Sequence, residues 1–340
     1  MLNRAVQKPV ASAILATASG SKDLSQRMAA LKQLPQCTGV EKHSESFTQF
    51  IDETLLMNPP VLDLLDLFSK INYSPGALKL LPRLHSFATS ATPADLSLVA
   101  FLCGNLGLKD AALWTALHSN FRSKTPKHLA RFYHGLSSVG LPLTDREKSE
   151  IASVLPRCRA VDLVMLNRAC QGSEISEEIS RSLVRLNEKL PGTAVVSLFE
   201  FLEKTNPEFL EYLAEQSRSL RLEPAFNDLG CVVVARKCAE ISWKDPRVLF
   251  QIVHFVNTHT LRKECLLPTV EAFAKLRIPD EKPWRRFVAR LEKLGPQLTS
   301  AEIRKFENCL RRAKQLDNRA HGVIHLLKDV RDDVDLYGAC

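Results

Sequence analysis

The chain has 340 residues, of which 45% are apolar and 25% are charged, and its formal net charge is +8. This is the composition of a globular protein with a large core, and no run of residues approaches the roughly 18 apolar positions that a membrane span needs. The nine cysteines are scattered without a C-x-x-C pair, which argues against a zinc module or a disulfide framework and favours buried thiols in a reducing compartment.

Residues 1–34 have the features of a mitochondrial targeting segment. They carry five basic side chains against one acid, and they are rich in alanine and serine. They also lack the uninterrupted apolar core of a secretory signal. We therefore predict import into the mitochondrial matrix, and the alternative is an ordinary amphipathic helix at the start of the folded chain. Residues 35–58 follow as a linker and a first helix around Phe47, Phe50 and Leu55.

Two later stretches, which begin at Thr92 and Thr125, share one pattern. Each opens with Thr-Pro, has a leucine three positions after the proline, and places a Gly-Leu pair eleven residues after that leucine. Threonine is a favoured N-cap, proline is tolerated at the first helical position, and glycine accepts the left-handed conformation that ends many helices. Each stretch is therefore predicted to be one helix, ending at Gly107 in the first and at Gly140 in the second.

The leucine of this pattern recurs through residues 35–328 at steps of 33 to 37 residues. The predicted equivalent positions are Val61, Leu96, Leu129, Leu163, Val196, Leu229, Leu266 and Ile303. A helical hairpin of this length cannot bury its apolar face alone, so neighbouring hairpins must stack. The predicted fold is all-α, an α-solenoid of about eight stacked helical-hairpin repeats of 33–37 residues, with Leu96, Leu129, Leu163 and Leu266 buried at equivalent places.

Local signals support this reading between the repeated leucines. Thr144 with Glu147 and Thr299 with Glu302 have the spacing of capping boxes, which mark helix N-termini. The one β-prone run, residues 231–235, lies where a repeat helix is due. It is therefore assigned to a helix as well, and no sheet is predicted.

A helical pair of this length, opened by a capped x-P-x-x-L and closed by L/V-G-L, resembles the organellar helical-repeat RNA-binding proteins. These are the FASTK-type, heptatricopeptide and octotricopeptide proteins, with the pentatricopeptide proteins related by period. The resemblance covers residues 59–158 best, and the sequence shows no C-terminal RAP domain. It implies an α-solenoid in mitochondria or chloroplasts that acts in RNA processing, stability, editing or translation.

The basic charge of the chain is concentrated in residues 277–328, which carry thirteen basic side chains against six acidic ones and precede an acidic tail at 329–340. Stacked helices would merge these charges into a patch that attracts phosphates. The candidate RNA- or partner-binding residues are Arg285, Arg286, Arg290, Lys293, Arg304, Lys305, Arg311, Arg312, Lys314 and Arg319. A solvated helix face and a docking site for an acidic protein are the alternatives.

Catalytic signatures are missing from the sequence, which has no P-loop, no G-x-S-x-G and no H-E-x-x-H motif. His321 and His325 stand four apart, but no third ligand joins them at metal-site spacing. We therefore predict no enzyme, no cofactor, no metal and no small-molecule substrate.

The predicted function is that of a non-catalytic mitochondrial helical-repeat protein. We expect it to bind single-stranded RNA, or to form part of an RNA-processing, RNA-editing or mitoribosomal ribonucleoprotein assembly together with other subunits. The alternative is a protein scaffold or assembly factor that makes no direct contact with RNA. Residues 35–276 have no net charge, which favours this alternative because a chain that tracked RNA along its whole length would be basic throughout.

Overall fold

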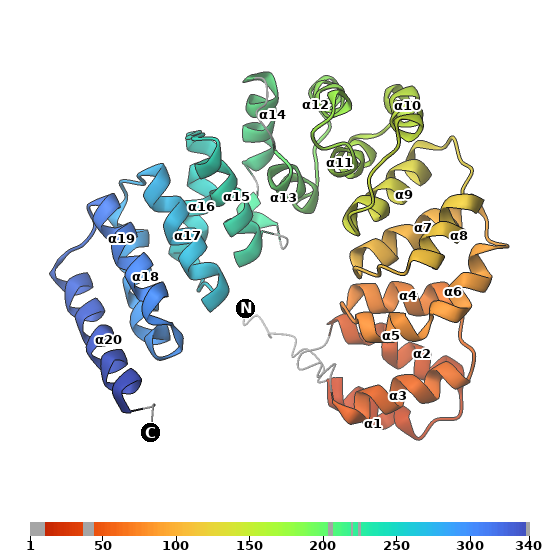
Figure 1. The fold of residues 1–340 in the computed structure, drawn as a ribbon, viewed down its shortest axis with the longest axis horizontal. Coiled ribbons are helices and arrows are strands. Elements are labelled where there is room, and N and C mark those ends of the chain that lie inside the picture. The colour runs from red at the N-terminus through yellow and green to blue at the C-terminus, as the bar shows by residue number, and fades with distance from the viewer. Residues whose placement is uncertain (1–10, 37–43, 203–206, 219, 224–225, 338–340) are drawn as a thin grey trace, which may run out of the picture. The chain divides into compact units, whose positions relative to one another are not determined.

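The computed structural model describes residues 11–36, 44–202, 207–218, 220–223 and 226–337, with side chains left out at 12 and 329–337. Over these residues the chain forms twenty α-helices and four short 3-10 helices, η1 to η4, and no strand (Figure 1). The all-α prediction is therefore confirmed for the described part of the chain. The chain divides into two compact units, unit 1 (Met1–Cys170) and unit 2 (Gln171–Cys340).

Unit 1 contains eleven α-helices within its described residues. They are α1 (Ala11–Ser19), α2 (Leu24–Gln33), α3 (Glu45–Leu56), α4 (Val61–Lys70), α5 (Ser74–Lys79), α6 (Leu81–Ala88), α7 (Pro93–Asn105), α8 (Ala111–Asn120), α9 (Pro126–Ser138), α10 (Asp145–Val154) and α11 (Ala160–Ala169), with η1 (Leu34–Gln36) and η2 (Leu155–Arg157). Helices α4, α7, α9 and α11 pack in succession as one row, and α6 packs on α8 in a second row.

Unit 2 repeats this arrangement with nine α-helices in its described part. They are α12 (Glu174–Leu186), α13 (Gly192–Glu200), α14 (Pro207–Ser217), α15 (Asp228–Glu240), α16 (Pro246–Thr258), α17 (Lys263–Leu276), α18 (Glu281–Leu294), α19 (Ser300–Ala313) and α20 (Asn318–Tyr337), with η3 (Leu220–Leu222) and η4 (Gly295–Gln297). The first row is α13, α15, α17 and α19, and the second row is α12, α14, α16, α18 and α20 (Figure 1). This packing of sequential neighbours is consistent with a helical repeat array.

The repeated core position is the fourth residue of each first-row helix. These residues are Leu64, Leu96, Leu129, Leu163, Val195, Cys231, Leu266 and Ile303, and all of them are buried. The prediction that Leu96, Leu129, Leu163 and Leu266 are buried at equivalent places is thus confirmed. Three predicted positions are wrong in register, because Leu229 is 54% exposed and Val61 and Val196 are not the fourth residues of their helices. The run 231–235 lies within α15, as predicted.

The turn that ends a first-row helix is a second repeated feature. In five helices (α7, α9, α15, α17 and α19) a residue with positive φ lies eleven positions after the buried fourth residue: Gly107, Gly140, Ser242, Arg277 and Lys314. In each case the N–H of the following residue donates to the carbonyl five positions earlier, as in the bond from Leu108 to Cys103 of 3.0 Å. This is the Schellman arrangement, which satisfies carbonyls that the helix end leaves without a partner.

The predicted helix caps are observed with one correction. The Thr92 hydroxyl accepts from the backbone N–H of Asp95, and both predicted capping boxes are formed at Thr144 and Thr299. Thr125 occupies the N-cap position of α9, but its side chain makes no capping hydrogen bond. The start of α9 therefore relies on Pro126, whose fixed φ suits the first helical position.

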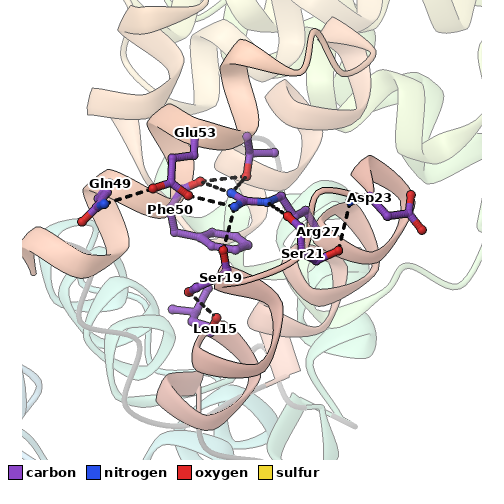
Figure 2. Close-up of polar contacts among 9 residues, drawn as sticks. Leu15, Ser19, Ser21, Asp23, Arg27, Gln49, Phe50 and Glu53 are labelled. Carbon is purple, nitrogen blue, oxygen red and sulfur yellow. Dashed lines mark hydrogen bonds and ion pairs between the residues drawn. The ribbon is translucent and has the colours of Figure 1, made fainter.

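Helices α1 and α2 are packed into unit 1 by the buried side chain of Arg27 (Figure 2). Its guanidinium donates to the carbonyls of Ser19 and Ser21 and to the Glu53 carboxylate of α3, each at 2.8 Å. It also lies 5.0 Å from the ring centroid of Phe50, which is a favourable cation–π geometry. The predicted targeting segment therefore contains residues that hold the folded unit together. Arg4 and Lys8, two of the five basic residues of the predicted targeting segment, lie outside the described residues.

Two tryptophans fill equivalent places in the core. Trp114 of α8 and Trp284 of α18 are each the fourth residue of a second-row helix, and both are buried. Their indole N–H groups donate to the carbonyls of Leu108 at 2.7 Å and Ile278 at 3.0 Å, which are the residues just after the left-handed turn. Both tryptophans therefore fill the core and bond their only polar group at the same time.

The seven described cysteines are buried, as predicted for thiols that pack in a core. Burial raises the pKa of Cys103 and of Cys238 to about 12, so neither is a thiolate near neutral pH. Cys37 and Cys340 lie outside the described residues. In the part of the chain that the structure describes, no group of three or more His, Cys, Asp or Glu residues is placed to hold a metal ion.

Among the described helices, none is both long enough and apolar enough to cross a lipid bilayer.

Candidate nucleic-acid interface

A stripe of three cations on α18 lines one cavity in unit 2. Arg286, Arg290 and Lys293 follow the i, i+4, i+7 spacing of one helix face, and all three border a cavity of about 180 Å³. Residues 259–261, from the loop between α16 and α17, also line this cavity. The stripe is about 10 Å long at 1.5 Å per residue. Three positive charges therefore converge on one small hollow.

Two of these cations also hold the end of α16 and the loop that follows it. Arg286 donates from Nη1 to the carbonyl of Asn257 at 2.6 Å, and Arg290 donates from Nε to the carbonyl of Leu261 at 2.8 Å. Among the described residues, no hydrogen bond engages the Nη1 and Nη2 groups of Arg290, and none engages Lys293. The cavity thus keeps donors that can bind an anion after the internal bonds have been made.

Three further cations border a second cavity beside α18. Arg285, Lys314 and Arg319 line a hollow of about 410 Å³, whose acidic residues are Glu281 and Asp317. Arg285 pairs with Glu281 at 2.7 Å, and Arg319 pairs more loosely with Glu292 at 3.5 Å. These ion pairs involve exposed side chains, which a polyanion can displace at little cost.

The predicted residues of α19 belong to the first row of helices, whereas α18 belongs to the second row. Arg304, Lys305 and Arg312 are exposed, and Arg312 is near enough to Lys275 of α17 for both charges to act on the same thiol, Cys309. The structure therefore distributes the ten predicted residues over two cavities at α18 and a separate set on α19.

Arg311 has a structural partner. It donates to Glu307 at 2.7 Å, and the same carboxylate accepts from Lys328 of α20 at 2.6 Å. The hydrogen bonds from Lys328 and then from Arg311 hold the pKa of Glu307 below its usual value, so the carboxylate stays charged and ties α20 to α19. Arg311 is for this reason a weaker candidate for ligand binding than its neighbours on α19.

A larger cavity adjoins the first one and was not predicted from the sequence. It measures about 550 Å³, and it shares His259 and Thr260 with the cavity of Arg286, Arg290 and Lys293. The exposed imidazole of His259 stacks on the buried ring of Phe255, with centroids 4.3 Å apart and planes within 6°. The Thr258 hydroxyl lies 2.9 Å from His259 Nδ1 and fixes the ring further. A lone histidine in a loop gives no sequence signal for such a site.

Unit 1 contains a cavity of a different character, with a volume of about 420 Å³. Its apolar walls come from α8 and from the end of α9 with the turn that follows: Trp114, Leu136, Val139, Leu141 and Pro142. At its edge His118 lies 2.5 Å from Glu147. Burial alone would raise the pKa of Glu147, but the hydrogen bonds from Thr144 and then from His118 outweigh burial and lower the pKa.

The sequence resemblance to organellar RNA-binding repeat proteins covers residues 59–158 best, and these residues belong to unit 1. The basic cavities lie elsewhere, around α18 in unit 2. The helical pattern and the charged surface are thus separate observations about the chain. Comparison with protein-family models and with curated proteins gives no match.

Proposed function

We propose that this chain is a non-catalytic helical-repeat protein that binds single-stranded RNA through unit 2. The observation that carries the proposal is the convergence of Arg286, Arg290 and Lys293 on one cavity, with donors left over after their internal bonds are made. Cations that neutralise phosphates supply most of the affinity of a protein for a nucleic-acid backbone.

A polymer fits this surface better than a small anion does. The stripe on α18 is long enough to contact more than one phosphate, and Arg285, the residue before Arg286 on the same helix, borders the second basic cavity. A small anion would use one hollow and leave the other charges unneutralised. A flexible polyanion could contact both hollows, because each is open at the surface of unit 2.

The repeat architecture and the cellular location of the protein are part of the same proposal. The buried fourth residue and the left-handed turn recur along the chain, which supports an α-solenoid of about eight hairpin repeats of 33–37 residues. We also propose residence in the mitochondrial matrix within a ribonucleoprotein assembly. The basic, acid-poor start of the sequence and the resemblance to organellar repeat proteins support that location.

The test is the salt dependence of RNA affinity. For a single strand each neutralised phosphate contributes about −0.7 to the slope of log affinity against log salt. Replacing Arg286, Arg290 and Lys293 by Gln should reduce the size of that slope by about 2 and weaken binding most at low salt. Fluorescence anisotropy with a labelled oligonucleotide measures both quantities.

The matched control removes the same charge from unit 1. Lys22, Lys124 and Lys127 are exposed, and replacing them by Gln should leave the slope unchanged. Lys293→Gln alone breaks no described hydrogen bond and should reduce the slope by about 0.7, which separates lost binding from lost stability. The proposal is wrong if the wild-type protein shows no salt-dependent binding, or if the control triple variant and the α18 triple variant behave alike.

A second candidate function, protein scaffolding, is favoured by the apolar cavity of unit 1. The cavity is large enough for a leucine or aromatic side chain of a partner segment. Lys109 at its border can form an ion pair with a carboxylate next to that side chain. Peptides with a leucine or tryptophan next to acidic residues should then bind the wild-type chain and lose affinity for Leu141→Glu. RNA affinity should not change in that variant, because Leu141 lies in unit 1.

A further inference from the structure

The cavity that adjoins the basic stripe has the size and lining of a site for a flat, polar ring. Its walls include the aromatic residues Phe226, Phe255 and His259, and its polar groups include Asn227 and Thr260. At about 550 Å³ it is larger than the cavity of about 180 Å³ beside it. Ligand sites commonly combine apolar or aromatic walls with a few polar groups in this way.

His259 is the element that joins the two cavities. One face of its imidazole is covered by Phe255, the ring is held by the Thr258 hydroxyl, and the residue is exposed at the border of both hollows. A flat side chain that is already ordered by stacking loses little conformational entropy when another ring stacks on it. Base stacking on aromatic side chains is a general means of binding unpaired nucleobases.

The polar groups around this cavity have capacity for hydrogen bonds. The Asn227 side chain accepts from the N–H of Gly230 through its Oδ1 atom at 3.1 Å, so its amide Nδ2 is the group that remains as a donor. Arg262 is engaged with Asp228, to which its Nη2 donates at 2.8 Å. A ring with acceptor atoms on its edge could therefore bond Asn227 while it stacks on His259.

We infer that the cavity lined by Phe226, Phe255 and His259 is a nucleobase subsite, in which an unpaired base of the bound strand stacks on His259 while the neighbouring phosphate lies against the basic stripe of α18. The inference rests on the proposed RNA-binding function and specifies its ligand. The recognised strand must expose its bases, so a fully paired duplex cannot fill the subsite.

A coupling experiment separates stacking from charge. The experiment measures the affinity of the wild-type protein and of His259→Ala for two ligands. One is a single-stranded oligonucleotide, and the other is a strand of the same length whose sugar-phosphate backbone carries no bases at its central positions. Loss of one stacked base should weaken binding about tenfold, whether the ring is removed from the protein or from the strand. Combining the two losses should cost little more than either loss alone, because both remove the same contact.

Conservative variants and a matched control complete the test. His259→Phe keeps a flat ring and should restore most of the affinity, whereas His259→Leu should not. His321→Ala removes another exposed histidine, on α20, and should have no effect. The salt slope should stay the same in all His259 variants, because the phosphate contacts remain.

The possible outcomes distinguish the two proposals. If the wild-type protein does not bind RNA at all, the proposed function fails and the subsite fails with it. If RNA binds with the expected salt slope but His259→Ala binds the base-containing strand as tightly as the wild type does, only the subsite is refuted. Equal affinity for duplex and single strand would also refute it.

Discussion

Arg27 shows how one charged side chain can fix a segment that we predict, from its sequence, to be a targeting segment. Arg27 is 5% exposed, and its guanidinium contacts α1, the following turn and α3 together, through the Ser19 carbonyl, the Ser21 carbonyl and the Glu53 carboxylate. The bond from Arg27, aided by Gln49, lowers the pKa of Glu53, so this carboxylate stays charged in weak acid. Positive charge in residues 1–34 thus has a structural use beside any role in targeting.

We expect Arg27→Leu to destabilise unit 1 by about 2–3 kcal/mol, because buried acceptors would lose a charged donor. The measurement is the free energy of unfolding from urea titration followed by circular dichroism. Lys32→Gln on the same helix is the control, since the ion pair of Lys32 with Asp63 joins exposed groups and should contribute less than about 0.5 kcal/mol. Equal stability of the two variants would show that α1 and α2 are not held by Arg27.

The same residue bears on targeting. If residues 1–34 were removed after import, Phe50 of α3 would lose the guanidinium of Arg27 that lies over its ring, and Glu53 would lose its ion-pair partner. A fusion of residues 1–30 to a reporter tests delivery to mitochondria, and the N-terminal sequence of the mature protein tests whether α1 and α2 are retained. Retention would reconcile the basic, acid-poor start of the chain with its place in unit 1.

At the scale of single elements, the sequence predicts a helix end well where the residue type favours the backbone conformation that the end requires. The helices that begin after Thr92 and Thr125 can be predicted because the residues with left-handed backbone at their ends are glycines, Gly107 and Gly140. The same turn is formed by Ser242, Arg277 and Lys314, residue types that seldom adopt positive φ and so carry no sequence signal. The repeat is therefore defined more by backbone geometry than by composition.

The misplaced core positions have a related cause. In α15 the buried fourth residue is Cys231, and the more apolar Leu229 lies two positions earlier and faces solvent. A leucine repeat at a fixed period points to Leu229, because a sequence shows which residues are apolar more clearly than it shows which face of the helix each residue occupies. The candidate site shows the same limit: the cations of α18 follow a helical stripe, whereas His259 is a single loop residue, and the cavity that it borders forms only when residues 221–223 and 226–228 pack nearby.

The contact between α7 and α9 depends on two glycines that face each other. A Cβ atom built on Gly104 would lie 2.6 Å from the Cα atom of Gly135, and one built on Gly135 would overlap the carbonyl of Ala100. These are backbone atoms that cannot rotate away as the end of a side chain can. The two helices can approach this closely only because both positions lack a side chain.

Gly135→Ala should therefore destabilise unit 1 by about 1–3 kcal/mol through overpacking. Gly322→Ala is the matched control, because a Cβ atom at Gly322 of α20 would meet nothing within 4 Å apart from its chain neighbours and the backbone of its own helix. That control variant should be neutral or up to about 1 kcal/mol more stable, since alanine loses less backbone entropy in a helix. Urea unfolding curves of both variants check the contrast. A Gly135→Ala protein as stable as the wild type would show that the two helices can separate at no cost.

At the scale of the whole molecule, the chain divides into Met1–Cys170 and Gln171–Cys340, and each unit has two rows of packed helices. Each unit has its own buried core, and a chain of this size can bury enough surface to fold alone. The basic cavities and His259 belong to unit 2, and the apolar cavity belongs to unit 1. The two candidate functions are therefore separable by cutting the chain.

We expect fragments 1–170 and 171–340 to be helical, each with one cooperative thermal transition in circular dichroism. Fragment 171–340 should bind single-stranded RNA within about threefold of the full chain and with the same salt slope, because Arg286, Arg290, Lys293 and the groups they bond lie within it. Fragment 1–170 should show no such slope and should keep affinity for leucine-containing acidic peptides. RNA binding by fragment 1–170, or its loss from a correctly folded fragment 171–340, would place the RNA-binding surface outside unit 2 and overturn the assignment to α18.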